Sequence, residues 1–140
     1  MYRLLYLSRA TARLSCDQLS ELVRVAHLRN QLAGITGLLC GAGASYLQVL
    51  EGPIVPVNRL LAKLTRDSRH TDVTVLHAGP CGARLFPHWG MRLVSAADLP
   101  GDDCARLLAS DPPESVAPQS LLAFLCRLSD RAACIPHVRS

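Results

Sequence analysis

Hydrophobic and polar residues follow two kinds of spacing in the first two thirds of this chain. The first eight residues alternate with the period of two that is typical of a half-buried strand. Two apolar runs joined by "GAGA" predict a hairpin. Four further segments are therefore expected as strands in addition to the first, namely "GITGLLC" (34–40), "SYLQVLEG" (45–52), "DVTVLHAG" (72–79) and "HWGMRLVS" (88–95).

Two other segments carry apolar residues at helical spacing. Ser15 and Gln18 predict a capping box, followed by a helix from about Cys16 to Arg29. A second helix has Pro56 in its first turn and should end near "RDSRH" (66–70). The resulting order, β-α-β-β-α-β-β, predicts an α+β fold of the ferredoxin-like type, with two helices on one face of the sheet.

The last third of the chain differs in character. Residues 1–95 are expected to form one domain, and residues 96–140 a C-terminal helical extension that packs on it. The predicted strands are apolar on both faces, and the two main helices can cover only one of them. Helices of the extension, or a partner subunit, should therefore cover the other face.

Gln48 is a polar side chain in the middle of the apolar run "SYLQVLEGP". Burying an amide without partners costs on the order of 1–3 kcal/mol. Tyr6 should lie on the neighbouring strand and Asn30 at the end of the first helix, so all three are expected to converge between the sheet and the helices. The residues alone favour a simple interpretation, in which they satisfy one another or Asn30 only caps its helix.

Composition excludes several classes of protein. The 140 residues carry a net charge of +4 with acidic residues interleaved, which is not the footprint of a nucleic-acid-binding protein. No apolar run approaches the ~20 residues of a membrane span, and no signal peptide is recognisable, so we expect a cytoplasmic protein. The six cysteines form no CxxC pair, and no metal site is predicted.

Five segments together resemble the BLUF family, blue-light sensors that use FAD. They are "YLSRA", "RNQLAGITGLL", "YLQVLEGP", "LLAKLTRDSRHTDV" and "RLFPHWGMRLV", and the resemblance covers roughly residues 2–95. It implies a non-covalently bound FAD, with FMN or riboflavin as substitutes. The family's photoactive tyrosine falls on Tyr6, its switching glutamine on Gln48 and its flavin-binding asparagine on Asn30. The tryptophan and methionine of the last strand fall on Trp89 and Met91.

The resemblance also implies a mechanism. Blue light excites the flavin, and an electron and then a proton leave Tyr6, with Gln48 on the proton path. Gln48 rotates or tautomerises, which changes a hydrogen bond to the flavin until the dark state returns. An amide suits this role because it carries a donor and an acceptor end, and so can invert its bonding without changing charge.

Further cofactor contacts are implied less directly. Basic residues after a helix can simply offset its negative end, which is the interpretation that the residues alone favour at positions 66–70. The resemblance implies contacts to the ribityl chain and phosphates instead. The side chains expected to take part are Ser8, Arg29, Arg66, Asp67, Arg69 and His70. Trp89 and Met91 should share one face of the fifth strand with Leu93, as core residues or as a link between the site and the sheet.

The function expected from these features is that of a short, stand-alone photoreceptor that signals to a partner protein. No nucleic acid or membrane contact is expected, and a homo-oligomer is compatible with the two-faced sheet. One alternative is a ferredoxin-like interaction module that has lost flavin, against which the presence of Tyr6, Asn30 and Gln48 argues. The other is a flavin-dependent redox enzyme, disfavoured because the nearest carboxylate, Glu51, falls on the face opposite Gln48.

Overall fold

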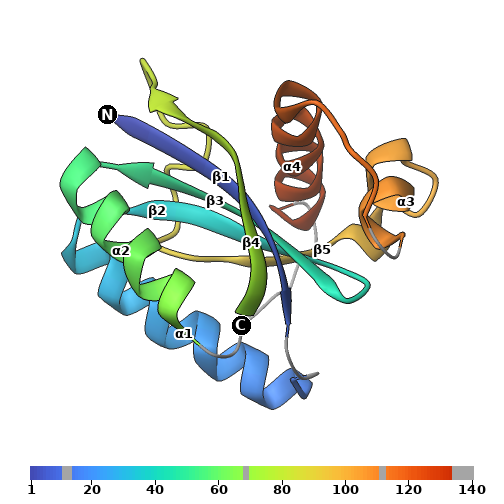
Figure 1. Cartoon of the computed structure of the whole chain (residues 1–140), viewed down its shortest axis with the longest axis horizontal. Helices are drawn as coiled ribbons and strands as arrows, with labels where there is room; N and C mark the ends of the chain where they lie inside the picture. The colour runs from blue at the N-terminus through green and yellow to red at the C-terminus, as the bar shows by residue number, and fades with distance from the viewer. Residues whose placement is uncertain (11–13, 68–69, 111–112, 134–140) are drawn as a thin grey trace.

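One five-stranded sheet lies between two helical layers (Figure 1). The computed structural model describes residues 1–10, 14–67, 70–110 and 113–133. Its elements are β1 (Tyr2–Ala10), α1 (Cys16–Leu32), β2 (Thr36–Ala42), β3 (Ser45–Gly52), α2 (Ile54–Arg66), β4 (His70–Pro80), β5 (Leu93–Ser95), the short 3-10 helix η1 (Ala96–Asp98), α3 (Asp103–Ala109) and α4 (Pro118–Ala133).

The strand order is β4-β1-β3-β2-β5. β1 pairs antiparallel with both β3 and β4, β3 pairs antiparallel with β2, and β5 is parallel to β2. This arrangement confirms the predicted ferredoxin-like topology. The capping box is also present, because Ser15 Oγ accepts from Gln18 N at 3.1 Å and Gln18 Oε1 accepts from Ser15 N at 2.9 Å. α1 runs three residues beyond its predicted end, to Leu32.

The sheet has an apolar cluster on each face, as the two-sided pattern predicted. The helix face, covered by α1 and α2, buries Leu4, Tyr6, Leu39, Leu50, Val57 and Leu60 among others. On the tail face, Leu5, Leu47 and Val49 pack with residues of α3 and α4 that include Leu108, Leu121, Phe124 and Leu125. Figure 1 shows these two helices on the side of the sheet away from α1 and α2. The C-terminal helices therefore cover the second face, as predicted.

The predicted fifth strand is wrong in its first five residues. Gly37 N donates to Trp89 O at 3.0 Å, and Leu39 N donates to Arg92 O at 2.8 Å. The two donors are two residues apart in β2, whereas their acceptors are three residues apart, so the segment 89–92 carries one extra residue and bulges. Regular pairing is confined to β5, residues 93–95.

This bulge changes which way the side chains point. Met91 and Leu93 pack in the cluster of the helix face, but Trp89 packs against the cluster of the tail face. Regular alternation would have placed all three on one side, and that expectation is wrong. The guanidinium carbon of Arg92 lies 4.2 Å from the centroid of the Trp89 ring, a cation–π contact.

Glu51 holds the long segment between β4 and β5 against the sheet. Its carboxylate is fully buried and accepts from Arg3 Nε at 2.8 Å, Leu85 N at 2.9 Å and Phe86 N at 2.8 Å. Arg84 adds bonds to the carbonyls of Glu51 and Gly34. Glu51 lies on the face away from Gln48, as alternation predicted. Its contacts, with those of Arg84, hold residues 84–86, in the first half of the segment 81–92, against the sheet.

None of the helices in the described parts of the chain combines the length and the apolar character that a membrane span requires. Within the same residues, no three His, Cys, Asp or Glu side chains gather as a metal site would need.

Candidate functional site

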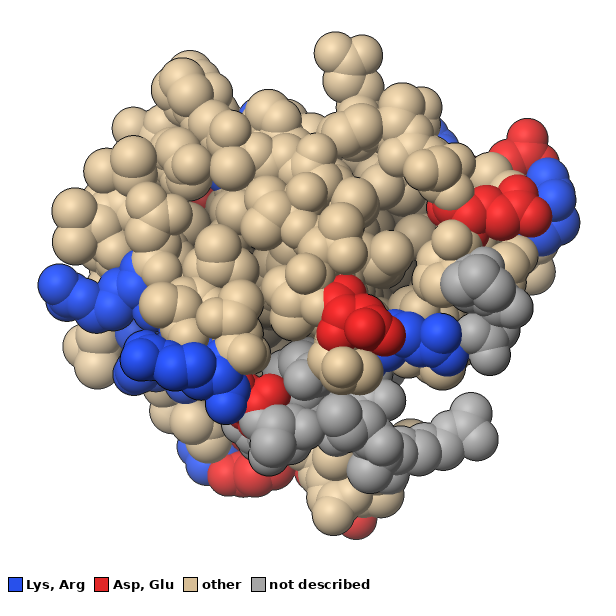
Figure 2. Space-filling model, viewed as in Figure 1, with Lys and Arg blue, Asp and Glu red and all other residues tan. Residues whose placement is uncertain are grey.

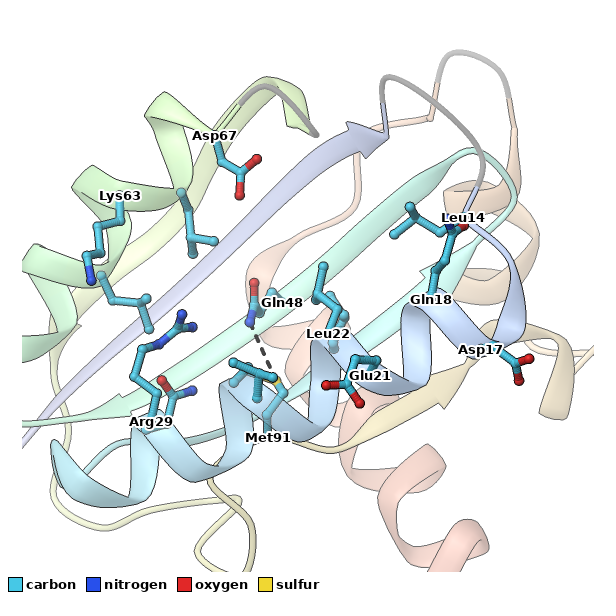
Figure 3. A pocket seen from close by; sticks show the side chains of 16 residues that line it. Leu14, Asp17, Gln18, Glu21, Leu22, Arg29, Gln48, Lys63, Asp67 and Met91 are labelled. Carbon is cyan, nitrogen blue, oxygen red and sulfur yellow. Dashed lines mark hydrogen bonds between the residues drawn. The ribbon is translucent and has the colours of Figure 1, made fainter.

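A cavity of about 700 Å³ opens between α1, α2 and the sheet. Its walls are mainly apolar side chains of the two helices and β2, among them Leu22, Val25, Ala26, Leu39, Leu60 and Leu64. Gln48 of β3 and Met91 form part of its floor, and Figure 3 shows both beneath the space between the helices. Volumes of 300–1,000 Å³ are usual for small-molecule and cofactor sites.

Gln48 and Tyr6 are direct neighbours across β1 and β3. The Tyr6 hydroxyl donates to Gln48 Oε1, and Gln48 Nε2 lies 3.5 Å from Met91 Sδ, which is a weak acceptor. Gln48 is only 7% exposed, and the part that remains open faces the cavity. Its amide nitrogen carries two hydrogens, so it can still donate to a ligand bound there. The predicted adjacency of Tyr6 and Gln48 is confirmed.

Asn30 lines the same cavity but has a different task from helix capping. The residue is 1% exposed, and its Nδ2 donates to Gly90 O at 2.9 Å. The C-cap of α1 is Ala33, three residues later, so the capping interpretation is wrong. Asn30 ties α1 to the bulged segment and presents an amide to the cavity at the same time.

Tyr6 lies below the cavity lining and reaches the cavity through Gln48. The residue is 1% exposed, and burial raises the pKa of its phenol well above the usual value because the phenolate would be desolvated. Tyr6 is therefore a neutral donor at neutral pH and well above it.

This burial predicts a difference between the wild type and Tyr6→Phe in alkali. An ordinary tyrosine ionises near pH ~10, but Tyr6 should keep its proton there, so phenolate absorbance of the two folded proteins should overlay to about pH 11. The unfolded chain releases this proton while the folded chain holds it, so the wild type should lose stability as pH rises above ~10. Tyr6→Phe should lack that loss. Phenolate curves that separate below pH ~11 would contradict the prediction.

Charged side chains of α1, of α2 and of the residue after α2 line the cavity. Arg29 of α1 and Lys63 of α2 both line it, and Figure 3 shows them at the same end. Asp67, directly after α2, also contributes to the lining. Lys63 was not predicted, although its position four residues before Asp67 on the helix would have placed it on the same side. Asp17, Gln18 and Glu21 near the start of α1 complete the polar lining.

Three other predicted site residues, Ser8, Arg66 and Trp89, are not among the described residues that line the cavity. Ser8 is buried on β1, paired with Tyr46, and it does not line the cavity. Arg66 Nε donates to Ala62 O at 3.2 Å on its own helix, which matches the interpretation that it serves the helix end. Trp89 belongs to the tail face. Arg69 lies outside the described residues. His70 is the first residue of β4, and the structure describes its backbone but not its side chain.

The residues of this cavity fit a flavin. Apolar walls on two helices suit the flat ring system, and the amides of Gln48 and Asn30 can bond the carbonyls and nitrogens at its polar edge. Arg29 and Lys63 supply positive charge for phosphate groups at one end of the cavity. Residues 14–67 thus provide both the apolar and the ionic contacts that such a cofactor needs.

Fold and cavity together define a ferredoxin-like domain with a cavity of cofactor size between its sheet and two helices. Residues 1–92 match the family of BLUF domains, described as sensors of blue light using FAD. The chain belongs to the BLUF family, whose members bind flavin.

Individual relatives are similar over the same region. The chain is 39% identical over 92 residues to photoactivated adenylate cyclase subunit beta of Euglena longa, a match that covers 64% of this chain and 11% of that protein. The chain thus spans about a tenth of the length of the curated relatives it matches.

Two solved structures show how far the fold is shared. BlrB, a BLUF protein in its dark state, superposes with a TM-score of 0.77 at 30% identity, over 90% of this chain and 95% of that one. Klebsiella pneumoniae BlrP1, solved with FMN and cyclic diGMP, gives 0.65 at 29% identity, over 77% of this chain and 33% of that one. The similarity to BlrB includes the C-terminal helices.

Proposed function

We propose that this chain binds FAD non-covalently in the cavity and signals through the hydrogen bond between Tyr6 and Gln48. The observation that carries the proposal is the position of Gln48. Its Oε1 accepts from a buried phenol, its Nε2 lies 3.5 Å from Met91 Sδ, and Gln48 and Met91 both line the cavity. One amide therefore connects the electron and proton donor, the cofactor edge and the segment that leads to β5.

A bound flavin supplies absorption of blue light and an acceptor for one electron. Tyr6, whose hydroxyl donates to Gln48 Oε1, would be the donor. It would regain the electron and the proton once Gln48 has rotated, so that the flavin would end oxidised and Tyr6 a neutral phenol. Rotation of the Gln48 amide exchanges its two ends, so that Nε2 faces the Tyr6 oxygen and Oε1 faces Met91. The phenol oxygen accepts in place of donating, and the net charge of the pair is unchanged.

The output of this rotation begins at Met91. A carbonyl oxygen in place of Nε2 removes the donor that now faces Met91 Sδ. Two residues earlier, Trp89 packs against the tail face, and β5 follows directly. We expect the change to reach the surface formed by β5 and α4, and a downstream protein to bind there. The chain would act by contact and without catalysis of its own, with FAD favoured over FMN because Arg29 and Lys63 can bind a diphosphate.

Absorbance of the purified protein tests the proposal. The preparation should be yellow, and blue illumination should give a small red shift of the oxidised flavin spectrum that reverses in the dark. A colourless protein that cannot be reconstituted with FAD would support an interaction module without flavin. Bleaching by an added reducing substrate, with no red-shifted state, would support a redox enzyme.

A further inference from the structure

His27 forms a contact that no part of the proposed switch uses. This half-buried residue lies one turn before Asn30 on α1, and its Nδ1 accepts from Met91 N at 3.3 Å. Together with the bond from Asn30 to Gly90 O, it fixes two consecutive residues of the bulged segment to one face of the helix. Met91, whose sulfur lies beside Gln48, is thus held in place through its own backbone N–H.

The approach of this segment to α1 is very close. A Cβ atom on Gly90 would lie 2.3 Å from His27 O and 3.1 Å from Gln31 Cγ. Only glycine can pack there without moving one of the two backbones. Gly90 already lies as close to the helix as its backbone allows. The position of Met91 is therefore set by two hydrogen bonds, from Asn30 to Gly90 O and from Met91 N to His27.

The bond to Met91 requires a particular protonation state of His27. An imidazole nitrogen accepts a hydrogen bond only when it carries no proton, so the other nitrogen, Nε2, must hold the hydrogen. In the imidazolium, both nitrogens donate, and Nδ1–H would point at the N–H of Met91. Protonation therefore replaces an attraction with a repulsion between two donors.

The other ionisable groups of α1 and of the bulged segment make contacts that do not involve Met91 N. On α1, Arg24 is paired with Glu21 at 2.6 Å. On the bulged segment, Arg92 stacks on Trp89, and His88 lies 5.4 Å from the same ring, centroid to centroid. β2 carries no charged side chain, and its Cys40 belongs to the tail face. Protonation of His27 itself is the change that acts on Met91 N.

We infer that His27 is a positioning residue whose protonation state sets the place of Met91 and thereby the return of Gln48 to its dark position. The inference rests on the proposed function, since it concerns the same switch. With neutral His27, Met91 Sδ stays beside Gln48 Nε2. With protonated His27, Met91 is no longer held in place, so the Gln48 amide does not find Met91 Sδ in its dark position. The dark state then reforms more slowly.

Dark recovery of the flavin-loaded chain between about pH 5 and 8 gives the kinetic test. The wild type should recover about threefold more slowly at the acidic end, the rate equivalent of one weak hydrogen bond. His27→Gln keeps an acceptor that does not titrate, so its recovery should be fast and flat with pH. His27→Leu should be slow throughout, and the matched control His88→Gln should keep the wild-type profile.

A second measurement reads the position of Met91 in the dark. The chain has only two methionines, so methyl-labelled protein should give two signals, and Met91→Leu identifies the second one. The Met91 signal should move with pH in the wild type, with the same midpoint as recovery, and should not move in His27→Gln.

The outcomes separate this inference from the proposed function. A wild-type protein without any red shift would overturn the proposed switch, while the methyl signal would still report whether His27 holds Met91. A normal red shift whose pH profile persists in His27→Gln, or a Met91 signal that ignores pH, would overturn the role of His27 alone.

Discussion

Gln48→Leu should abolish the reversible red shift while flavin stays bound. Leucine is close to glutamine in size but has neither donor nor acceptor, so it removes the bonds to Tyr6 and to the flavin edge together. The apolar walls of the cavity and the charges of Arg29 and Lys63 remain. We expect flavin affinity to fall only about fivefold, the usual value of one hydrogen bond. Difference absorbance under blue light and a flavin titration measure the two effects.

Tyr6→Phe should give the same loss by a smaller change, because it deletes only the hydroxyl that donates to Gln48. The matched control is Tyr46→Phe, two residues before Gln48 on β3 and on the same face, which should keep the red shift. A full photocycle in Gln48→Leu or in Tyr6→Phe would show that the switch lies elsewhere. Loss of the shift in Tyr46→Phe as well would point to packing of the whole face.

The second large effect concerns stability. Glu51→Gln should lower the free energy of unfolding by about 3 kcal/mol, since it removes the charge from a fully buried acceptor of three hydrogen bonds. The new amide group would face Leu85 N or Phe86 N as a donor against a donor, and Arg3 would lose its counter-charge. Urea unfolding of the protein, followed by circular dichroism, measures the change.

Glu21→Gln provides the control for Glu51→Gln. It makes the identical substitution in an ion pair with Arg24 that is more than half exposed, and its urea midpoint should not move. If both variants unfold at the wild-type midpoint, the Glu51 contacts do not stabilise the fold. If Glu51→Gln is folded but its dark recovery is altered, the segment 81–92 transmits the change to Met91.

Sequence patterns were sufficient for the framework and for the centre of the site. Period-two alternation and helical spacing predicted the order of strands and helices, and the two-sided apolar pattern predicted a second helical layer. Once the strands were ordered, Tyr6 and Gln48 were expected to lie close together, because β1 and β3 are adjacent in a ferredoxin-like sheet, and the register of the structure pairs them directly. These features depend only on the residue pattern within each segment and on the strand order of the ferredoxin-like fold.

Other parts of the site depend on where separate segments meet. Lys63 faces the cavity only because α2 lies across from α1. The side-chain amide of Asn30 donates to Gly90 O and does not cap its own helix. Arg66, predicted among the cofactor contacts, donates to Ala62 O on its own helix. No pattern within one segment reports these pairings, because each is decided by a neighbour far away in the sequence.

By itself the sequence determined the order of strands and helices, and it predicted an inward-facing amide and phenol on neighbouring strands beneath two helices. Only the tertiary structure decided that Met91 would face this pair and Trp89 the opposite side of the sheet. Side chains alternate between the two faces only in a regular strand. The alternation is interrupted where one segment has one residue more than the strand with which it pairs. Here β2 fixes residues 89 and 92, α1 holds Gly90 and Met91, and the extra residue turns Met91 toward the switch.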